Sequence, residues 1–286
     1  MTRAAAVPAA MIVTLTLWPA TATGQALLTQ PQRYALTTDV FDGRALWVQP
    51  AGMARRREAT VGWSVTADQR GGITTLEQYG LTLVSRGFGL GWQRAELIDD
   101  THVSQWAVGY GAGGPRASLG VTRRWLRGER VQDAVWDIGA RVVPRPLLEV
   151  SVVWRDIGDP TVRAPAGVPS PQDTSYGSTL LPAAALTLLG GRARLGGEWE
   201  LVTSSWGTSA VRFGGAVVLP FHLGLQVRAE FAGDFAYRDL AVALTWSAAR
   251  GRVTGFGAFP QGGGARQFGL WGSAVRDLEP RVPGFR

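Results

Sequence analysis

The residue types that most often perform catalytic or metal chemistry are scarce in this chain. It has two histidines: His102, which follows Asp99 and Asp100, and His222, at the start of an alternating segment. Neither has a second histidine for a metal site or a recognisable serine partner for nucleophilic catalysis. Because there is no cysteine, disulfides, thiol catalysis and thiolate metal sites are excluded. We therefore expect no catalytic residue, no cofactor and no metal ion.

Two features formally suggest nucleotide or nucleic-acid binding. Residues 109–114 match the G-x-G-x-x-G pattern, but Pro115 and a strand-like segment follow instead of the required helix, which indicates a turn. The formal net charge is +7, yet the longest basic run is Arg55, Arg56 and Arg57 and the other arginines are scattered. We expect no nucleic-acid partner. This run, just before the first expected strand, is better placed to meet lipid phosphates or the periplasm.

The first 26 residues have the pattern of a secretory signal. Arg3 gives a short basic start, residues 4–17 are apolar, and small residues follow with a cleavage site favoured after Ala26. The apolar run is too short to span about 30 Å of hydrocarbon as a helix. We expect export from the cytoplasm.

From residue 59 onward, apolar and polar residues alternate with a period of two, as in β-strands with two different faces. The clearest case is residues 221–232, where Phe221, Leu223 and Leu225 alternate with His222, Gly224 and Gln226. The sequence predicts fourteen strands, at residues 59–67, 76–85, 87–95, 103–111, 116–126, 133–143, 147–156, 177–189, 192–203, 208–218, 221–232, 238–248, 252–259 and 266–277.

The connections between these segments alternate between tight turns and longer polar loops, which favours a transmembrane antiparallel β-barrel. Lipid does not satisfy unpaired backbone groups, so a sheet in a membrane must close on itself. Tryptophans near many segment ends agree with aromatic belts at the lipid boundaries. The fold class is therefore all-β: an outer-membrane barrel of about fourteen strands at residues 59–286. A β-sandwich, in a secreted soluble protein, is the alternative.

In such a barrel, the polar face of each strand points into the lumen. The lumen candidates are Arg141, Arg155, Arg212, Arg228, Glu149 and Glu230. In the hairpin at residues 144–146, the spacing places Arg141 near Glu149 and Asp137 near Arg155, which would stabilise the strand pair. Glycines on the same face either keep the lumen roomy or let a plug approach the wall: Gly89, Gly91, Gly139, Gly196, Gly214 and Gly224.

Residues 27–58 do not alternate and contain Ala45-Leu46-Trp47-Val48-Gln49-Pro50-Ala51-Gly52-Met53-Ala54. This stretch resembles the "NPAG(L/M)A" segment near the start of fatty-acid-transporter-like and PorV-like outer-membrane barrels, with Gln49 in place of asparagine. The hairpin from Trp136 to Pro160 also resembles that group. The resemblance implies an N-terminal periplasmic plug at residues 27–58, with Gln49, Pro50, Ala51 and Gly52 as its motif. Phe285 is penultimate instead of terminal, which departs from the usual barrel pattern.

Two functions remain open at this point. The first, which the resemblance to fatty-acid transporters implies, is passage of small hydrophobic molecules across the outer membrane of a Gram-negative-type bacterium. The second, implied by the PorV resemblance, is binding of an exported protein during secretion or surface assembly, for which the loop at residues 162–175 is a candidate. Membrane lipid is the expected partner in both cases.

Overall fold

The computed structural model describes residues 34–54, 58–70, 73–96, 102–163, 174–263 and 266–278. The expected signal at residues 1–26, the first part of the expected plug and the Arg55–Arg57 run lie outside the described residues.

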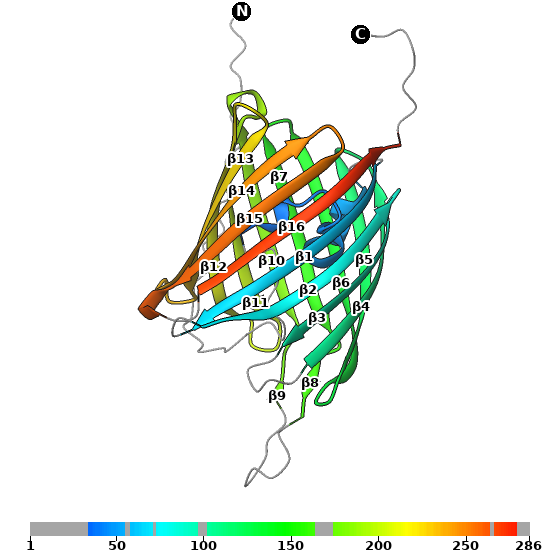
Figure 1. The fold of residues 1–286 in the computed structure, drawn as a ribbon, viewed down its shortest axis with the longest axis vertical. Helices are drawn as coiled ribbons and strands as arrows, with labels where there is room; N and C mark the ends of the chain where they lie inside the picture. The colour runs from blue at the N-terminus through cyan, green and yellow to red at the C-terminus, as the bar shows by residue number, and fades with distance from the viewer. Residues whose placement is uncertain are drawn as a thin grey trace, which may run out of the picture.

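Within the described residues, fourteen antiparallel strands form a closed barrel (Figure 1). Each strand pairs with the next one along the chain, except that β7 pairs with β10 and β1 closes the barrel against β16. The strands are β1 (Glu58–Arg70), β2 (Ile73–Ser85), β3 (Phe88–Glu96), β4 (His102–Gly113), β5 (Ala117–Gly128), β6 (Gln132–Arg145), β7 (Leu148–Ile157), β10 (Thr179–Leu188), β11 (Ala193–Val202), β12 (Gly207–Leu219), β13 (Leu223–Ala232), β14 (Tyr237–Ala248), β15 (Gly251–Pro260) and β16 (Arg266–Asp277).

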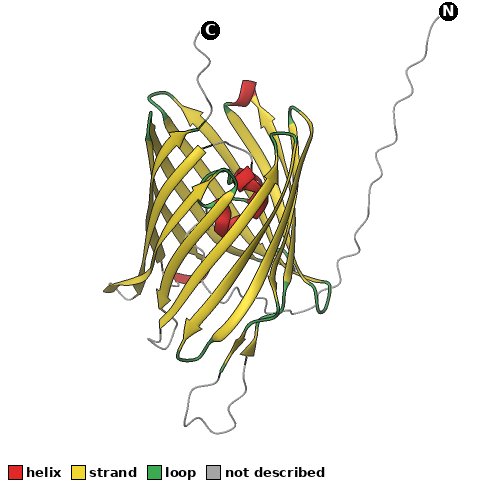
Figure 2. Ribbon diagram, turned by 90° about the vertical axis from the view of Figure 1, so that its right-hand side faces the viewer, coloured by secondary structure: helices red, strands yellow, loops and turns green. Residues whose placement is uncertain are grey.

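The remaining short elements lie at the two ends of the barrel and in its interior. β8 (Thr161–Val162) and β9 (Thr174–Ser175) form a small hairpin below the barrel in Figure 1. Before β1, the chain forms η1 (Thr37–Asp39), α1 (Ala45–Val48) and η2 (Pro50–Ala54), which lie inside the barrel (Figure 2). One-turn 3-10 helices η3 (Leu189–Gly191) and η4 (Gln261–Gly263) follow β10 and β15. None of the described helices is long and apolar enough to cross a membrane.

The two faces of the strands are inverted relative to a soluble β-sandwich. Along β4, the exposed outward residues include Trp106, Val108 and Tyr110, whereas Gln105 and Gly109 face inward and are buried. Outward apolar side chains recur on the other strands, among them Trp63, Leu81, Trp154 and Trp246. In a sandwich these apolar side chains would form the core. The sandwich alternative is therefore wrong, because the sheet closes and its apolar face points outward.

The strand predictions from sequence agree closely with these bounds. Residues 252–259 correspond to β15, and residues 266–277 are β16 without change. The β8–β9 hairpin falls in a segment predicted to be a loop. His222 is not on the polar face of a strand as predicted, because β13 begins at Leu223 and His222 adopts a positive φ of 61° in the preceding turn.

Candidate functional site: the lumen and the segment inside it

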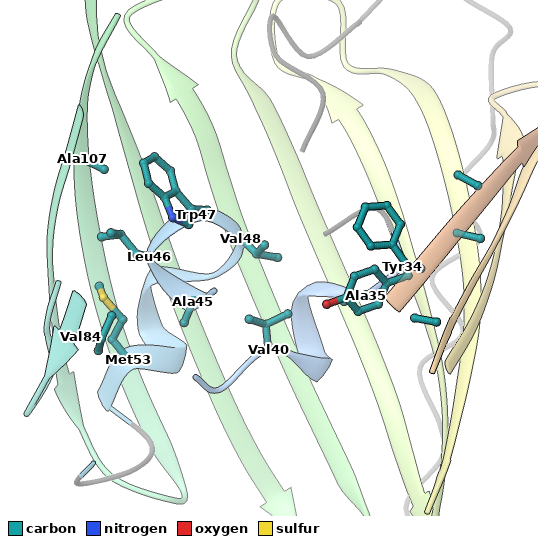
Figure 3. Close-up of a cluster of buried hydrophobic side chains, with 14 residues drawn as sticks. Tyr34, Ala35, Val40, Ala45, Leu46, Trp47, Val48, Met53, Val84 and Ala107 are labelled. Atoms are coloured by element: carbon teal, nitrogen blue, oxygen red, sulfur yellow. The ribbon is translucent and has the colours of Figure 1, made fainter. Parts of the chain in front are cut away.

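Residues 34–54, which we call the luminal segment, cross the interior of the barrel (Figure 3). Its apolar side chains form one buried cluster with wall residues from β2, β4, β14 and β15. The cluster consists of Tyr34, Ala35, Val40, Ala45, Leu46, Trp47, Val48, Met53, Val84, Ala107, Ala241, Ala243, Phe256 and Ala258. Because short extended and 3-10 pieces leave many backbone groups unpaired, the segment depends on the wall for hydrogen-bond partners.

Glycines on the inner wall let the luminal segment lie directly against the strands. A Cβ added at Gly89 would lie 2.8 Å from Sδ of Met53 and 2.9 Å from Cδ1 of Leu46. At Gly91 it would meet the ring of Trp47, and at Gly196 and Gly214 it would approach Leu36. Of the two roles left open for the six glycines, close approach of a plug describes five of them, whereas a Cβ at Gly224 would meet only the wall residues Thr245 and Val217.

The motif Gln49-Pro50-Ala51-Gly52 contacts β5 and β6. Gln49 donates from Nε2 to the carbonyl of Ala140 at 3.2 Å, and its Oε1 accepts from the backbone N–H of Ala51. An added Cβ at Gly120 on β5 would collide with the Pro50 backbone. Gly52 itself packs on the carbonyl of Val40, so a larger residue would not fit there.

Three acid–arginine contacts join the luminal segment to itself and to the wall. Asp39 pairs with Arg194 on β11 at 2.7 Å, whose Nη2 also donates to the carbonyl of Thr38. Asp42 pairs with Arg44 at 2.8 Å and with Arg252 on β15 at 3.4 Å. The guanidinium of Arg44 lies 4.8 Å above the ring of Trp271. Asp39, Asp42 and Arg44 are buried, so their contacts are stronger than at a surface, whereas Arg252 is partly exposed.

The two carboxylates differ in their electrostatic balance. Burial raises the pKa of Asp39 above its ordinary value by more than the neighbouring Arg194 lowers it. Burial alone would also raise the pKa of Asp42, but the charge and hydrogen bonds of Arg44, together with Arg252, outweigh it. The pKa of Asp42 therefore lies below its ordinary value. The charged form of Asp42 is thus more favourable in the folded protein than that of Asp39.

Arg141 and Glu149 form the wall pair that the sequence predicted. Nε of Arg141 donates to Oε1 of Glu149 at 2.5 Å, and Arg194 lies 3.2 Å from the other carboxylate oxygen. The guanidiniums of Arg141 and Arg194 stand 5.4 and 5.6 Å from the ring of Phe41. The wall pair therefore also contacts the luminal segment.

The other predicted pair, Asp137 with Arg155, is wrong. Asp137 accepts from Arg124 at 2.7 Å and from the backbone N–H of Asp156, while Arg155 donates to the carbonyl of Val48 at 3.1 Å. A register irregularity between Trp136 and Ile138 changes which residues face one another across β6 and β7.

The remaining lumen candidates, Arg212, Arg228 and Glu230, lie together on β12 and β13. Arg212 donates to Glu198 at 2.9 Å, to Glu200 at 2.5 Å and to Glu230 at 2.8 Å. Arg228 lies 3.4 Å from Glu230 and 3.7 Å from Asp239. All six lumen candidates therefore belong to the inner wall. Arg141 and Glu149 form one group, and Arg212, Arg228 and Glu230 form another. Arg155 belongs to neither group and contacts the luminal segment at Val48.

One sector of the inner wall is apolar instead. Ala241 and Ala243 on β14 stand opposite Ala258 and Phe256 on β15, and all four are buried against the luminal segment. The ring of Tyr34 packs 5.2 Å from that of Phe256. The lumen thus has a charged sector on β12 and β13 beside an apolar sector on β14 and β15.

The described residues contain no group of three or more metal-ligating side chains, and His102 and His222 are both exposed. Only the end of the Gly109–Gly114 stretch is a turn, because Gly109 and Gly111 lie in β4 against Met53. Sequence reasoning missed the wall anchors Arg194, Arg252 and Trp271 and the segment residues Asp39, Asp42 and Arg44. For Arg194 and Arg252 a signal was available, because the alternation of their strands places both on the polar, inward face.

No protein-family model and no curated protein matches the chain. Solved structures with a similar fold include CymD, a monoaromatic hydrocarbon channel, with a TM-score of 0.55 at 9% identity over 84% of this chain and 94% of that one. The Pseudomonas putida toluene transporter TodX matches with a TM-score of 0.46 at 11% identity over 84% and 94% of the two chains. Acinetobacter baumannii Omp33 matches with a TM-score of 0.48 at 10% identity over 77% and 98%.

At such low identity these likenesses concern the fold alone, and of these three structures only CymD matches with a TM-score above 0.5. Together with the closed sheet and its outward apolar face, it defines the class: a fourteen-stranded barrel of the outer-membrane type. The finer resemblance to fatty-acid-transporter-like and PorV-like barrels stays a prediction.

Proposed function

We propose that the chain is an outer-membrane barrel that passes small apolar molecules through its lumen, with the luminal segment as its plug. The observation that supports this most is the apolar sector of Ala241, Ala243, Ala258 and Phe256, which borders Tyr34 and Ala35. In the neighbouring charged sector, arginines pair with carboxylates, and these polar groups favour water. An apolar molecule would therefore bind best along the apolar sector, where it displaces the least strongly held water. The fold likeness to a hydrocarbon channel agrees with this proposal.

In the described arrangement, the plug covers the apolar sector, since all four wall residues are buried against it. Passage therefore requires the chain around Tyr34 and Ala35 to move away from β14 and β15. β1 begins and β16 ends at the short-turn end, which, together with the expected export signal, supports a periplasmic position for that end. The protein-binding alternative rests on a loop whose residues 164–173 lie outside the described residues.

Native mass spectrometry of the barrel, extracted gently from its own outer membrane, tests this proposal. We expect a retained apolar molecule that is lost in Ala258→Gln, because the substitution places an amide in the apolar sector at a desolvation cost of about 1–3 kcal/mol. Gln105→Ala is the matched control, since Gln105 is an equally buried inner residue on β4. A barrel that carries a stoichiometric exported protein and no apolar molecule would instead support the protein-binding alternative.

A further inference from the structure

The end of the barrel formed by the short turns has an unusual set of exposed residues. Five of the six described turns between strands have an exposed arginine in the turn or at its edge: Arg86, Arg116, Arg145, Arg192 and Arg250. The sixth turn, between β12 and β13, contains His222. No aspartate or glutamate occurs in any of these six turns. The turns of this end therefore present positive charge, and the acidic residues found there, Glu58 and Asp277, are the first residue of β1 and the last residue of β16.

The backbone at several of these positions is held by the neighbouring strand. The carbonyl of Arg116 accepts from the N–H of Val143 at 2.7 Å, that of Arg192 from Val218 at 2.7 Å, and that of Arg250 from Val275 at 2.9 Å. These hydrogen bonds fix the backbone of the three arginines at the edge of the wall. Their side chains have no acidic partner among the described residues, so their charge is available to an external anion.

Exposed apolar side chains accompany the arginines in the same turns. Leu147 follows Arg145, Leu189 precedes Arg192, and Phe221 occupies the sixth turn. Leu189 is 76% exposed and Phe221 is 85% exposed, and both adopt positive φ. All three side chains are exposed, as are the apolar side chains on the outward face of the strands. Apolar residues beside arginines are typical of surfaces at the boundary between acyl chains and phosphates.

The opposite end has a different charge pattern. There, exposed Arg127 and Arg163 occur in the same loops as Glu129 and Asp159, and Asp234 lies in a further loop of this end. Exposed Arg266, the first residue of β16, lies at this end as well. The chain enters β1 and leaves β16 at the turn end (Figure 1). Because the turn end faces the periplasm in the proposed orientation, its anionic neighbours are the phospholipids of the inner leaflet.

We propose that the turn-end arginines form a binding surface for anionic phospholipid headgroups, with Leu147, Leu189 and Phe221 inserted among the acyl chains. The arginines donate to the phosphate oxygens, for which their forked geometry is suited. This inference depends on insertion of the barrel in a membrane but not on transport. A failure of lipid binding therefore leaves the passage of apolar molecules untouched, and the reverse is also true.

The test compares two triple variants of the full chain that change the net charge equally. The turn-end variant is Arg116→Gln, Arg192→Gln and Arg250→Gln, and the loop-end variant is Arg127→Gln, Arg163→Gln and Arg266→Gln. Each is purified in detergent, given an equimolar mixture of phosphatidylglycerol and phosphatidylcholine, and examined by native mass spectrometry. The readout is the ratio of the two lipids retained. Heat-dependent mobility on a gel confirms that each variant is a folded barrel.

We expect the wild type and the loop-end variant to retain phosphatidylglycerol preferentially. In the turn-end variant the preference falls by about fivefold for each arginine removed. Equal retention of the two lipids by the wild type would overturn the proposal. So would a loop-end variant that loses the preference as strongly as the turn-end variant, since the effect would then follow net charge alone.

Discussion

The carboxylate of Glu198 on β11 accepts a hydrogen bond of 2.9 Å from the backbone N–H of Thr37 in the luminal segment. Its other oxygen accepts from Arg212 at 2.9 Å. One buried carboxylate therefore connects the charged group on β11–β13 with the start of η1. Charged acceptors make hydrogen bonds stronger than neutral ones, so this contact holds the start of η1 against β11.

Removal of this contact should loosen the luminal segment. In Glu198→Ala, hydrogen exchange of residues 34–41 should accelerate, because Thr37 and its neighbours lose a charged acceptor worth about 1.5–3 kcal/mol. Glu200→Ala is the control: Glu200 also binds Arg212 but has no described hydrogen bond to the segment. Equal acceleration in both variants would show that loss of the ion pair with Arg212 is responsible, and not loss of the hydrogen bond from Thr37.

The two carboxylates of the luminal segment should respond differently to neutralisation. Asp39→Asn should change exchange of the segment little at neutral pH, since burial already disfavours the charge and raises the pKa of Asp39. Asp42→Asn should accelerate exchange more strongly, because it removes the partner of both Arg44 and Arg252. A larger effect from Asp39→Asn would contradict this order.

The pH dependence follows from the same shifts with opposite signs. The stability that the lowered pKa of Asp42 gives to the luminal segment is present above the ordinary pKa of an aspartate and is lost as the pH falls through the lowered value. The stability linked to the raised pKa of Asp39 is present below the ordinary pKa of an aspartate and is lost as the pH rises through the raised value. Hydrogen exchange of the segment between acid and neutral pH should therefore show both changes, and each should vanish in the corresponding asparagine variant.

A methyl group on the inner wall should displace the plug. In Gly120→Ala the new Cβ collides with the Pro50 backbone, and overpacking of this kind costs about 1–3 kcal/mol. We expect the ionic conductance of the barrel in a planar bilayer to rise. Gly255→Ala is the control, because a Cβ there meets only Cδ2 of Leu270 at an ordinary 3.6 Å. An unchanged conductance in Gly120→Ala would argue that Pro50 does not close the lumen.

Two adjacent arginines on β5 should differ in their contribution to stability. Arg124 binds both Asp137 and Asp156 inside the barrel, so Arg124→Met leaves two buried carboxylates without it and should cost about 3–5 kcal/mol. Arg123 faces outward and stacks on Trp125 and Trp136. Arg123→Met should cost at most about 1 kcal/mol. Urea unfolding of the barrel in lipid vesicles measures both, and comparable losses would contradict the inward placement of Arg124.

The alternation of side chains made the barrel wall predictable from the sequence. A period of two shows which residues share a face, and each of the fourteen segments predicted from it corresponds to a barrel strand, β15 and β16 included. The same reasoning found the Arg141–Glu149 pair, which lies within one hairpin. It failed for Asp137 and Arg155, because an irregularity in β6 shifts the pairing in a way that the pattern does not reveal.

The interior contacts were less predictable, since they join residues far apart in sequence. Asp39 meets Arg194 across 155 positions, and Asp42 meets Arg252 across 210. The luminal segment has no alternation and makes only short helical turns, so neither its depth nor its partners follow from local pattern. The glycines were the clearest sequence signal of its position, because missing side chains on the polar face leave room for a second chain.

Entry of an apolar dye into intact cells tests the central proposal most directly. N-phenyl-1-naphthylamine fluoresces once it has passed the lipopolysaccharide barrier and entered the inner membrane. Cells that make the wild-type barrel should take it up faster than cells that make Ala258→Gln, and Gln105→Ala should match the wild type. Uptake at the same rate with the wild type, with Ala258→Gln and without the barrel would contradict passage of apolar molecules along β14 and β15.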